Sequence, residues 1–328
     1  MITRMTTSMM AGTTLATIQR NFNRLADVNK QLSSGKRMSF ASDDPASSVS
    51  SMRLRKELAA TEQFKRNISD ANSWLATSDA AMQSVADRYT EARTLLINSI
   101  DGALGDKSQG ALAAQLRKIA ESIMSQANST YLGRTVFAGN SDKGLVFKTG
   151  LDKEGDTLFL AAEKDEITAK TVDRRIDADT TVQANVDGNK LFGTGTVKWN
   201  DTDKTKLDTD NNPSVMNLLI AAAQILESPS GPVGENRQKI ESIQKELGER
   251  FAKLQEAQSA VGARHKQVLE AQNSVIFDLQ QVKGQISDVE DIDIQKVTID
   301  MSLASMAYQA SLSSTQRVVQ PTLLDYLR

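Results

Sequence analysis

The sequence predicts a mainly α-helical fold: an elongated bundle with coiled-coil helices at its ends and a small, mostly antiparallel β domain inserted in the middle of the chain. Three observations lead to this prediction. Apolar residues recur at every seventh position over long stretches of both halves of the chain. Residues 46–101 contain no Gly or Pro that would interrupt a helix. Between about 140 and 212, Gly, Asp and Thr separate short β-prone runs.

The first predicted helix runs from Met5 to about Leu32 and carries one apolar seam. Its apolar residues follow one another at steps of three, four, three and seven, which is the spacing of a heptad repeat and not of a strand. These residues are Leu15, Ile18, Phe22, Leu25 and Leu32. Gly35 follows the seam, and a glycine at this place suits the left-handed conformation that ends a helix.

The second predicted helix is much longer. Asp44 is placed as its N-cap and Pro45 as its first residue, where the missing N–H of proline costs nothing. A helix of about 55 residues would be about 80 Å long, which indicates a coiled coil or an elongated bundle. The segment Gly102–Gly105 ends it, and a shorter helix is expected over about 108–132. The heptad positions are Leu54, Thr61, Ile68, Leu75, Met82, Tyr89 and Leu96.

The middle of the chain is predicted to form short strands. Gly150, Gly155 and Asp187–Asn189 are the expected turns between them, because these residue types favour turn conformations. The expected strands are Leu145–Lys148, Thr157–Leu160, Ile167–Val172, Thr180–Val186 and Thr196–Trp199.

Helical patterns return near Ser214 and resume after Gly234. The companion positions of the new seam include Arg250, Arg264 and Asp278, and this mixture fits a helix packed on one side of a bundle. The seam itself is apolar at every heptad position: Ile240, Leu247, Leu254, Val261, Val268, Val275, Val282 and Val289.

We therefore divide the chain into three parts. Residues 1–40 and 289–328 are the terminal helices, and residues 41–139 and 213–288 form the long helical bundle. Residues 140–212 are a variable β-rich domain.

The composition excludes several classes of function. The chain of 328 residues has no Cys, one His and a net charge of −2. It therefore has no disulfide framework, no thiolate metal site and no site that needs two histidines. The net charge gives no electrostatic reason to expect nucleic-acid binding. No apolar run approaches the roughly 18–20 residues of a membrane helix, and Met1–Thr7 lacks the pattern of a cleavable signal peptide.

No catalytic, cofactor-binding or metal-ligating residue is predicted. His265 lies inside a predicted helix between two cationic residues, so we expect it at the surface or boundary of the bundle and not in a triad. The cluster Asp208–Asn212 lacks the Gly and Glu that a calcium loop starting at Asp208 requires. Gly193–Gly195 lacks the lysine ending of a phosphate-binding loop.

The two terminal segments are unusual because they are nearly uncharged. Met5 to Gln19 has no charge, and Arg317 is the single charge between Met301 and Leu324. A helix that faces water normally carries charges opposite its apolar stripe, so we expect these helices to be covered by copies of themselves, in preference to forming flexible tails. The residues assigned to this assembly interface are Leu15, Ile18, Phe22, Leu25, Leu32, Ile294, Val297, Met301, Tyr308, Leu312, Leu323 and Leu324.

Three segments carry a family resemblance. Leu32–Arg37 followed by Ala41–Ala46 resembles the signature that follows the first helix of the flagellin superfamily. Gly133–Gly139 and Leu323–Leu327 resemble segments of those members that lie at the junction between hook and filament. The start Met1–Arg4 departs from the common opening of the superfamily, and the middle β region cannot be matched motif by motif.

The resemblance implies a structural protein of the bacterial flagellum that is not an enzyme. It implies an adaptor at the hook–filament junction that assembles as a homo-oligomeric ring through its terminal helices. The implied partners are the first hook-associated protein, flagellin and an export chaperone, with neither nucleic acid nor membrane insertion. The implied location is extracellular, after type III export without a cleaved signal peptide.

Two other functions stay open at this point. The nearest is filament flagellin itself. The other is a secreted adhesive or glycan-binding protein that would use the β domain, supported by Trp199 and the Asp- and Thr-rich loops. An enzyme has no competent group of residues apart from the isolated His265.

Overall fold

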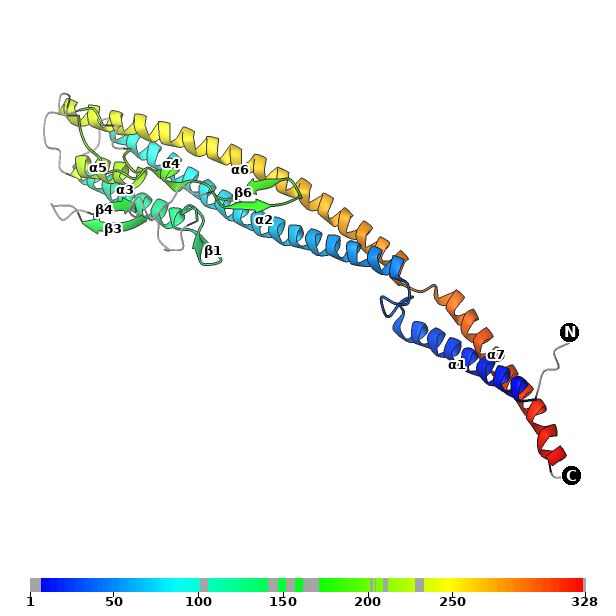
Figure 1. Cartoon of the computed structure of the whole chain (residues 1–328). Coiled ribbons are helices and arrows are strands. Elements are labelled where there is room, and N and C mark those ends of the chain that lie inside the picture. Colours follow the sequence, from blue (N-terminus) through cyan, green and yellow to red (C-terminus); the bar gives the residue numbers. More distant parts are fainter. Residues whose placement is uncertain are drawn as a thin grey trace. The chain divides into compact units, whose positions relative to one another are not determined.

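The structure is a computed structural model that describes residues 7–100, 106–140, 147–151, 157–161, 171–200, 203, 205–208, 212–227 and 233–326. The chain forms two compact units. The first consists of Met1–Glu62 and Phe277–Arg328, and the second of Gln63–Ile276. The helices α2 (Pro45–Ile100) and α6 (Val233–Glu290) contribute to both units (Figure 1).

The first unit contains the paired helices α1 (Thr7–Ser34) and α7 (Ile294–Tyr326), which lie side by side in Figure 1. The Phe22 and Tyr308 rings are 5.9 Å apart between their centroids. The Asn21 amide donates a hydrogen bond of 3.3 Å to the carbonyl oxygen of Ala307. These contacts pair the two ends of the chain.

Local sequence signals set the boundaries of α1 and α2 as predicted. Gly35 has a φ of +68°, and its N–H bonds to the carbonyl of Gln31, so the glycine ends α1 in the left-handed conformation. The Asp44 carboxylate accepts a hydrogen bond of 3.1 Å from the N–H of Ser47, and Pro45 is the first residue of α2. Asp44 is therefore the N-cap.

In the second unit, α2 and α6 pack along each other. The Tyr89 and Phe251 rings lie 5.7 Å apart, and a ring nitrogen of His265 lies 2.8 Å from Oδ1 of Asn72. The two seams predicted from the heptads, whose residues belong to both units, are confirmed. All seven heptad residues of α2 are buried, and so are those of α6 except Val289, which is half-buried. Burial of these apolar side chains is the main force that holds the long helices together.

Two shorter helices, α3 (Asp106–Ala127) and α5 (Val215–Glu227), also pack against each other in this unit (Figure 1). The predicted helix over 108–132 ends earlier, at Ala127, and the chain then turns at Leu132 and Gly133, which adopt φ of 50° and 78°. That turn joins β1 (Thr130–Tyr131) to β2 (Arg134–Thr135). The predicted break at Gly102–Gly105 lies outside the described residues.

In the described part of the chain, the strands form three two-stranded antiparallel sheets, which confirms the small antiparallel β region in the middle of a mainly helical chain. Besides β1 and β2, β3 (Phe147–Leu151) pairs with β4 (Thr157–Ala161), and β5 (Asp173–Arg175) pairs with β6 (Thr181–Gln183).

Parts of the predicted β region are wrong. Gly150 is paired with Leu158 inside β3 and is not a turn. Thr196–Trp199 is not a strand, because Trp199 makes only an isolated bridge to Leu207. Most of the predicted strand Ile167–Val172, together with the predicted turn at Gly155, lies outside the described residues.

The predicted turn at Asp187–Asn189 instead starts the short helix α4 (Gly188–Phe192). The Asp187 carboxylate accepts a hydrogen bond of 3.0 Å from the N–H of Asn189 and so caps the helix. Gly188 is needed for packing, since a Cβ there would lie 2.8 Å from the carbonyl oxygen of Phe137.

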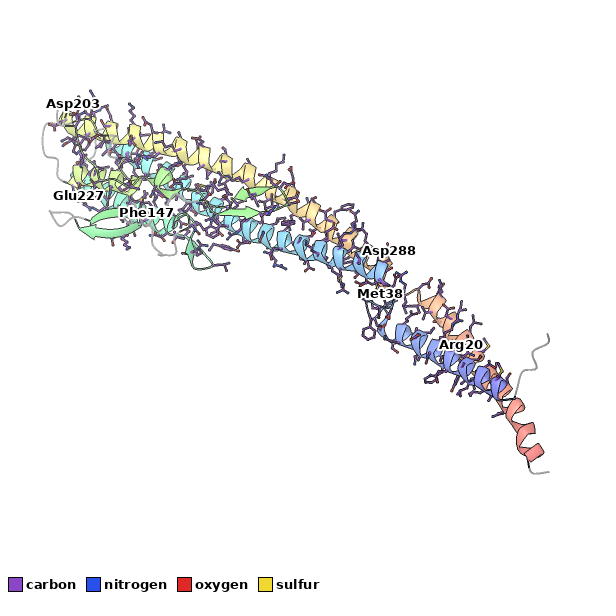
Figure 2. The ribbon with its side chains drawn as sticks, viewed as in Figure 1. Arg20, Met38, Phe147, Asp203, Glu227 and Asp288 are labelled. Carbon is purple, nitrogen blue, oxygen red and sulfur yellow. The ribbon has the colours of Figure 1, made fainter. Side chains whose placement is uncertain are left out.

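Two asparagine side chains attach the β3–β4 pair to the helical part of the unit. The Asn217 amide of α5 pairs with both the N–H and the carbonyl of Phe159 in β4, at 2.9 Å each. The Asn128 amide, just after α3, pairs in the same way with Phe147, which is labelled in Figure 2. Each amide offers a donor and an acceptor in the way a neighbouring strand would, which matters because an isolated hairpin is only marginally stable.

Candidate functional site

The predicted assembly residues lie along the α1–α7 pair of the first unit, and the structure divides them into two groups. Val297 is buried, while Ile18, Leu25, Leu32, Met301 and Tyr308 are half-buried. The other four described residues are exposed: Leu15 at 70%, Ile294 at 67%, Phe22 at 50% and Leu312 at 40%. The side chains of Leu323 and Leu324 lie outside the described residues.

A second apolar stripe on α7 was missed by the sequence analysis. Ile299, Leu303 and Met306 are 61%, 52% and 55% exposed. They are spaced by four and three residues, so they share one face, about half a turn away from the buried Val297 and Ala304. The signal for this stripe was present, because residues 301–316 contain no charge and apolar residues occur on two faces.

The outer face of α1 has the opposite character. Arg20, Arg24, Asp27 and Lys30 are all exposed there. The side-chain view in Figure 2 labels Arg20 on this helix. The pair thus has one helix with a charged outer face and one with an apolar outer face. The apolar outer face of α7 resembles a surface that another helix would cover.

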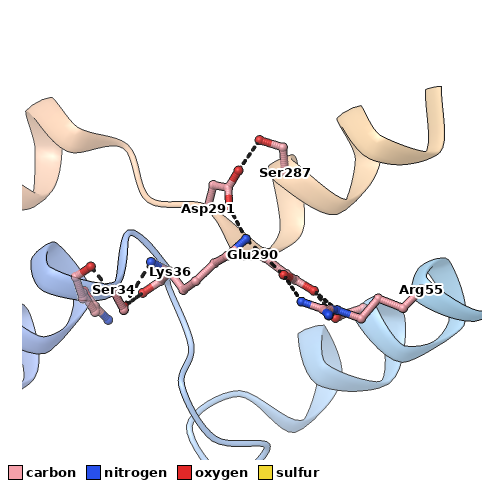
Figure 3. Close-up of polar contacts among 8 residues, drawn as sticks. Ser34, Lys36, Arg55, Ser287, Glu290 and Asp291 are labelled. Carbon is pink, nitrogen blue, oxygen red and sulfur yellow. Dashed lines mark hydrogen bonds and ion pairs between the residues drawn. The ribbon is translucent and has the colours of Figure 1, made fainter. Parts of the chain in front are cut away.

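A polar cluster lies where α1 and α7 connect to α2 and α6 in the first unit (Figure 3). We call it the Glu290 cluster, and it consists of Lys36, Ser51, Arg55, Glu290 and Asp291. Its central carboxylate, Glu290, has a side chain that is only 6% exposed. Arg55 donates two hydrogen bonds of 2.7 Å to it, one to each oxygen. Ser51 donates a third, and Nζ of Lys36 lies 3.2 Å from the carboxylate.

The second carboxylate of the cluster is exposed. Asp291 accepts a hydrogen bond of 2.6 Å from Nζ of Lys36 and another from the Ser287 hydroxyl. The hydrogen bonds from Arg55, and then those from Ser51 and Lys36, outweigh the effect of burial and lower the pKa of Glu290 to about 2. Both carboxylates are therefore charged at neutral pH and match the two cations of the cluster.

Other candidate residues do not form a reactive site. His265 is half-buried with its ring nitrogen on Asn72, and Arg264 donates to the carbonyl of Asn185. Nζ of Lys239 lies 5.7 Å from the ring centre of the half-buried Trp199. Among the described residues, no group of three or more His, Asp or Glu side chains is placed to hold a metal ion. None of the described helices combines the length and the apolar composition that crossing a bilayer requires.

Both ends of the chain match known protein families. Residues 5–142 match the profile of the bacterial flagellin N-terminal helical region, and residues 244–327 match that of the bacterial flagellin C-terminal helical region. The two matched segments hold α1, α7 and the Glu290 cluster.

Individual relatives are more distant. Flagellar hook-associated protein 3 of Salmonella typhimurium is 24% identical over 240 residues, which cover 72% of this chain and 70% of that protein. A flagellin of Clostridium tyrobutyricum is 25% identical over 139 residues, covering 42% of this chain and 37% of that protein. The crystal structure of flagellar hook-associated protein 3 from Legionella pneumophila has a similar fold, with a TM-score of 0.57 and 13% identity, and the match covers 73% of this chain and 98% of that one.

Proposed function

Because this chain belongs to the flagellin superfamily, we propose that it is a structural subunit of the bacterial flagellum that acts as an adaptor at the hook–filament junction. The extent of the similarities supports this role over that of a filament flagellin. The chain matches 70% of a hook-associated protein 3 but 37% of a flagellin, with nearly equal identities. The role requires no enzymatic activity.

The observation that carries the proposal is the surface of the α1–α7 pair. Among the α7 side chains that the structure describes, five large apolar ones are at least 40% exposed: Ile294, Ile299, Leu303, Met306 and Leu312. Three of them, Ile299, Leu303 and Met306, form one stripe, and an apolar stripe on a helix is typical of a surface that a partner covers. We assign the partner as a second copy of the chain, whose own α1–α7 pair offers the exposed Leu15 and Phe22.

The full proposal follows from this assignment. Copies of the chain pack their terminal helices into a ring, which contacts the first hook-associated protein on one side and flagellin on the other. An export chaperone covers the terminal segments before assembly, and the subunit leaves the cell by type III export without a cleaved signal peptide. The division into terminal helices, long bundle (41–139 and 213–288) and β-rich domain (140–212) is part of the same proposal.

Deletion of residues 1–30 tests the role of the terminal pair. The shortened chain should lose binding to hooks that carry the first hook-associated protein, while its long-helix bundle stays folded. A stable shortened chain that still joins the hook tip would disprove assembly through the terminal helices.

Filament flagellin is the second candidate, supported by the Clostridium tyrobutyricum relative. The two functions differ in self-assembly. A purified adaptor needs its neighbours and should not form long filaments alone, whereas extended polymerisation of the purified chain would favour flagellin.

A further inference from the structure

We propose that Glu290 is a positioning residue, which holds the end of α1 beside the start of α7 so that these two helices are prepared to pair. The inference rests on the proposed function, because it concerns how the same terminal pair reaches the form that assembles.

The Glu290 carboxylate joins three segments of the first unit (Figure 3). Glu290 is the last residue of α6, Arg55 and Ser51 come from α2, and Lys36 comes from the connection after α1. Lys36 also bonds to Asp291 in the connection that leads to α7. One buried carboxylate and its neighbour therefore tie both connections to α2.

The backbone of the two connections is paired at the same place. Lys36 and Asp291 form an isolated antiparallel bridge. The N–H of Arg37 donates to the carbonyl of Glu290 at 2.6 Å, and the N–H of Ile292 donates to the carbonyl of Gly35 at 3.2 Å. As a result, the residue that ends α1 and the residues that precede α7 are direct neighbours.

This arrangement lowers the cost of pairing α1 with α7. The hydrogen bond between Asn21 and Ala307 joins residues 286 positions apart, and each helix alone has a seam that is only partly buried. Two marginal helices pair more readily when their adjoining ends are already held together, since closure of the loop costs less entropy. The Glu290 cluster therefore raises the effective concentration at which α1 and α7 meet.

The positioning role of Glu290 can be tested without unfolding the bundle, because the cations that pair with Glu290 are exposed to water. The side chains of Arg55 and Lys36 are 62% and 41% exposed. After Glu290→Gln, neither cation is left buried without a partner, so the packed seams of α2 and α6 should survive. Asp288→Asn is the matched control, because Asp288 lies exposed near the same end of α6 (Figure 2).

The rate of disulfide formation between cysteines introduced into α1 and α7 measures the pairing of these helices directly. The chain has no cysteine of its own that could compete. Asn21→Cys and Ala307→Cys introduce one thiol on each helix, at the two residues that the hydrogen bond between α1 and α7 joins. In the isolated full-length chain at fixed oxidant concentration, we expect Glu290→Gln to slow intramolecular disulfide formation roughly tenfold. Asp288→Asn should leave the rate unchanged.

Two results would overturn the proposal. The first is an equal cross-linking rate in the Glu290→Gln variant and the control. The second is a slower rate accompanied by loss of the helical melting transition of the bundle, which would make Glu290 a residue of general stability. The assay needs no hook, so it is independent of the proposed function: failure of the unaltered chain to bind hooks would refute the function while the rate comparison still tests Glu290.

Discussion

At the scale of single residues, two buried carboxylates of α6 have different roles. Glu246 and Arg250 are 5% and 2% exposed and form an ion pair of 3.0 Å inside the second unit. Burial raises the pKa of the neighbouring Tyr89 hydroxyl, which therefore stays protonated. Glu290, in contrast, is paired with cations that reach water. Loss of either carboxylate should cost stability, but only loss of Glu290 should also change how readily α1 and α7 pair.

Glu246→Gln should lower the free energy of unfolding by about 3–5 kcal/mol, because it leaves the buried Arg250 without a counter-charge. Urea unfolding of the purified chain measures this change. Glu249→Gln, an exposed site on the same helix, should stay within about 0.5 kcal/mol of the unaltered chain. Equal losses of unfolding free energy in the two variants would show that the buried ion pair contributes no more to stability than an exposed carboxylate does.

The Glu290 cluster should also give stability a pH dependence. The pKa of Glu290 is lowered from 4.5 to about 2 in the folded chain, so its contribution is complete above about pH 4.5 and is lost as the pH falls towards 2. The difference in unfolding free energy between the unaltered chain and Glu290→Gln should shrink over this window. A difference that stays constant from pH 6 to pH 2 would contradict the ionic role of the cluster.

At the scale of elements, the helices could be predicted and the β region only in part. Heptad spacing identified the seams of α2 and α6, and Asp44, Pro45 and Gly35 gave correct boundaries, because these signals act within a few residues. The hairpins are short and depend on distant partners such as Asn217. No local pattern reveals such a partner.

The candidate site, too, could be predicted only in part. The seam residues that face the partner helix, such as Val297 and Tyr308, follow from periodicity. The outer stripe at Leu303 did not, because a heptad repeat identifies only the positions that meet one partner helix. The Glu290 cluster was missed because it brings together residues 36, 55 and 290, which only the fold makes neighbours.

The role of Asn217 as an anchor of β3 and β4 can be tested by substitution. Asn217→Ala removes the hydrogen bonds to Phe159 and to the carbonyl of Gly195, and it deprives the buried backbone of Phe159 of both partners. We expect a loss of about 1–3 kcal/mol, with faster hydrogen exchange at Phe159. Asn98→Ala, at an exposed site of α2, is the control. Unchanged exchange in the Asn217 variant would mean that the hairpin holds its place by apolar packing alone.

At the scale of the whole molecule, we propose that the chain combines a well-packed bundle with terminal helices that only a partner covers fully. Limited proteolysis of the purified chain should remove roughly the first 35 and the last 40 residues and leave a stable middle, because the terminal pair buries little apolar surface by itself. In an assembled ring the same segments should resist cleavage. Protected ends in the free chain would point to an ordinary globular protein.

The most direct test of the central claim, assembly through the terminal pair, targets the outer stripe of α7. Leu303→Asp combined with Met306→Asp places charge on two side chains that face away from the buried seam of α7, so the subunit should fold normally. Leu132→Asp removes a side chain that is 80% exposed in the β1–β2 turn and serves as the control. Binding of each purified chain to hooks that carry the first hook-associated protein is the measurement. We predict that the double variant loses binding while the control keeps it; a double variant that binds as well as the control would contradict the account.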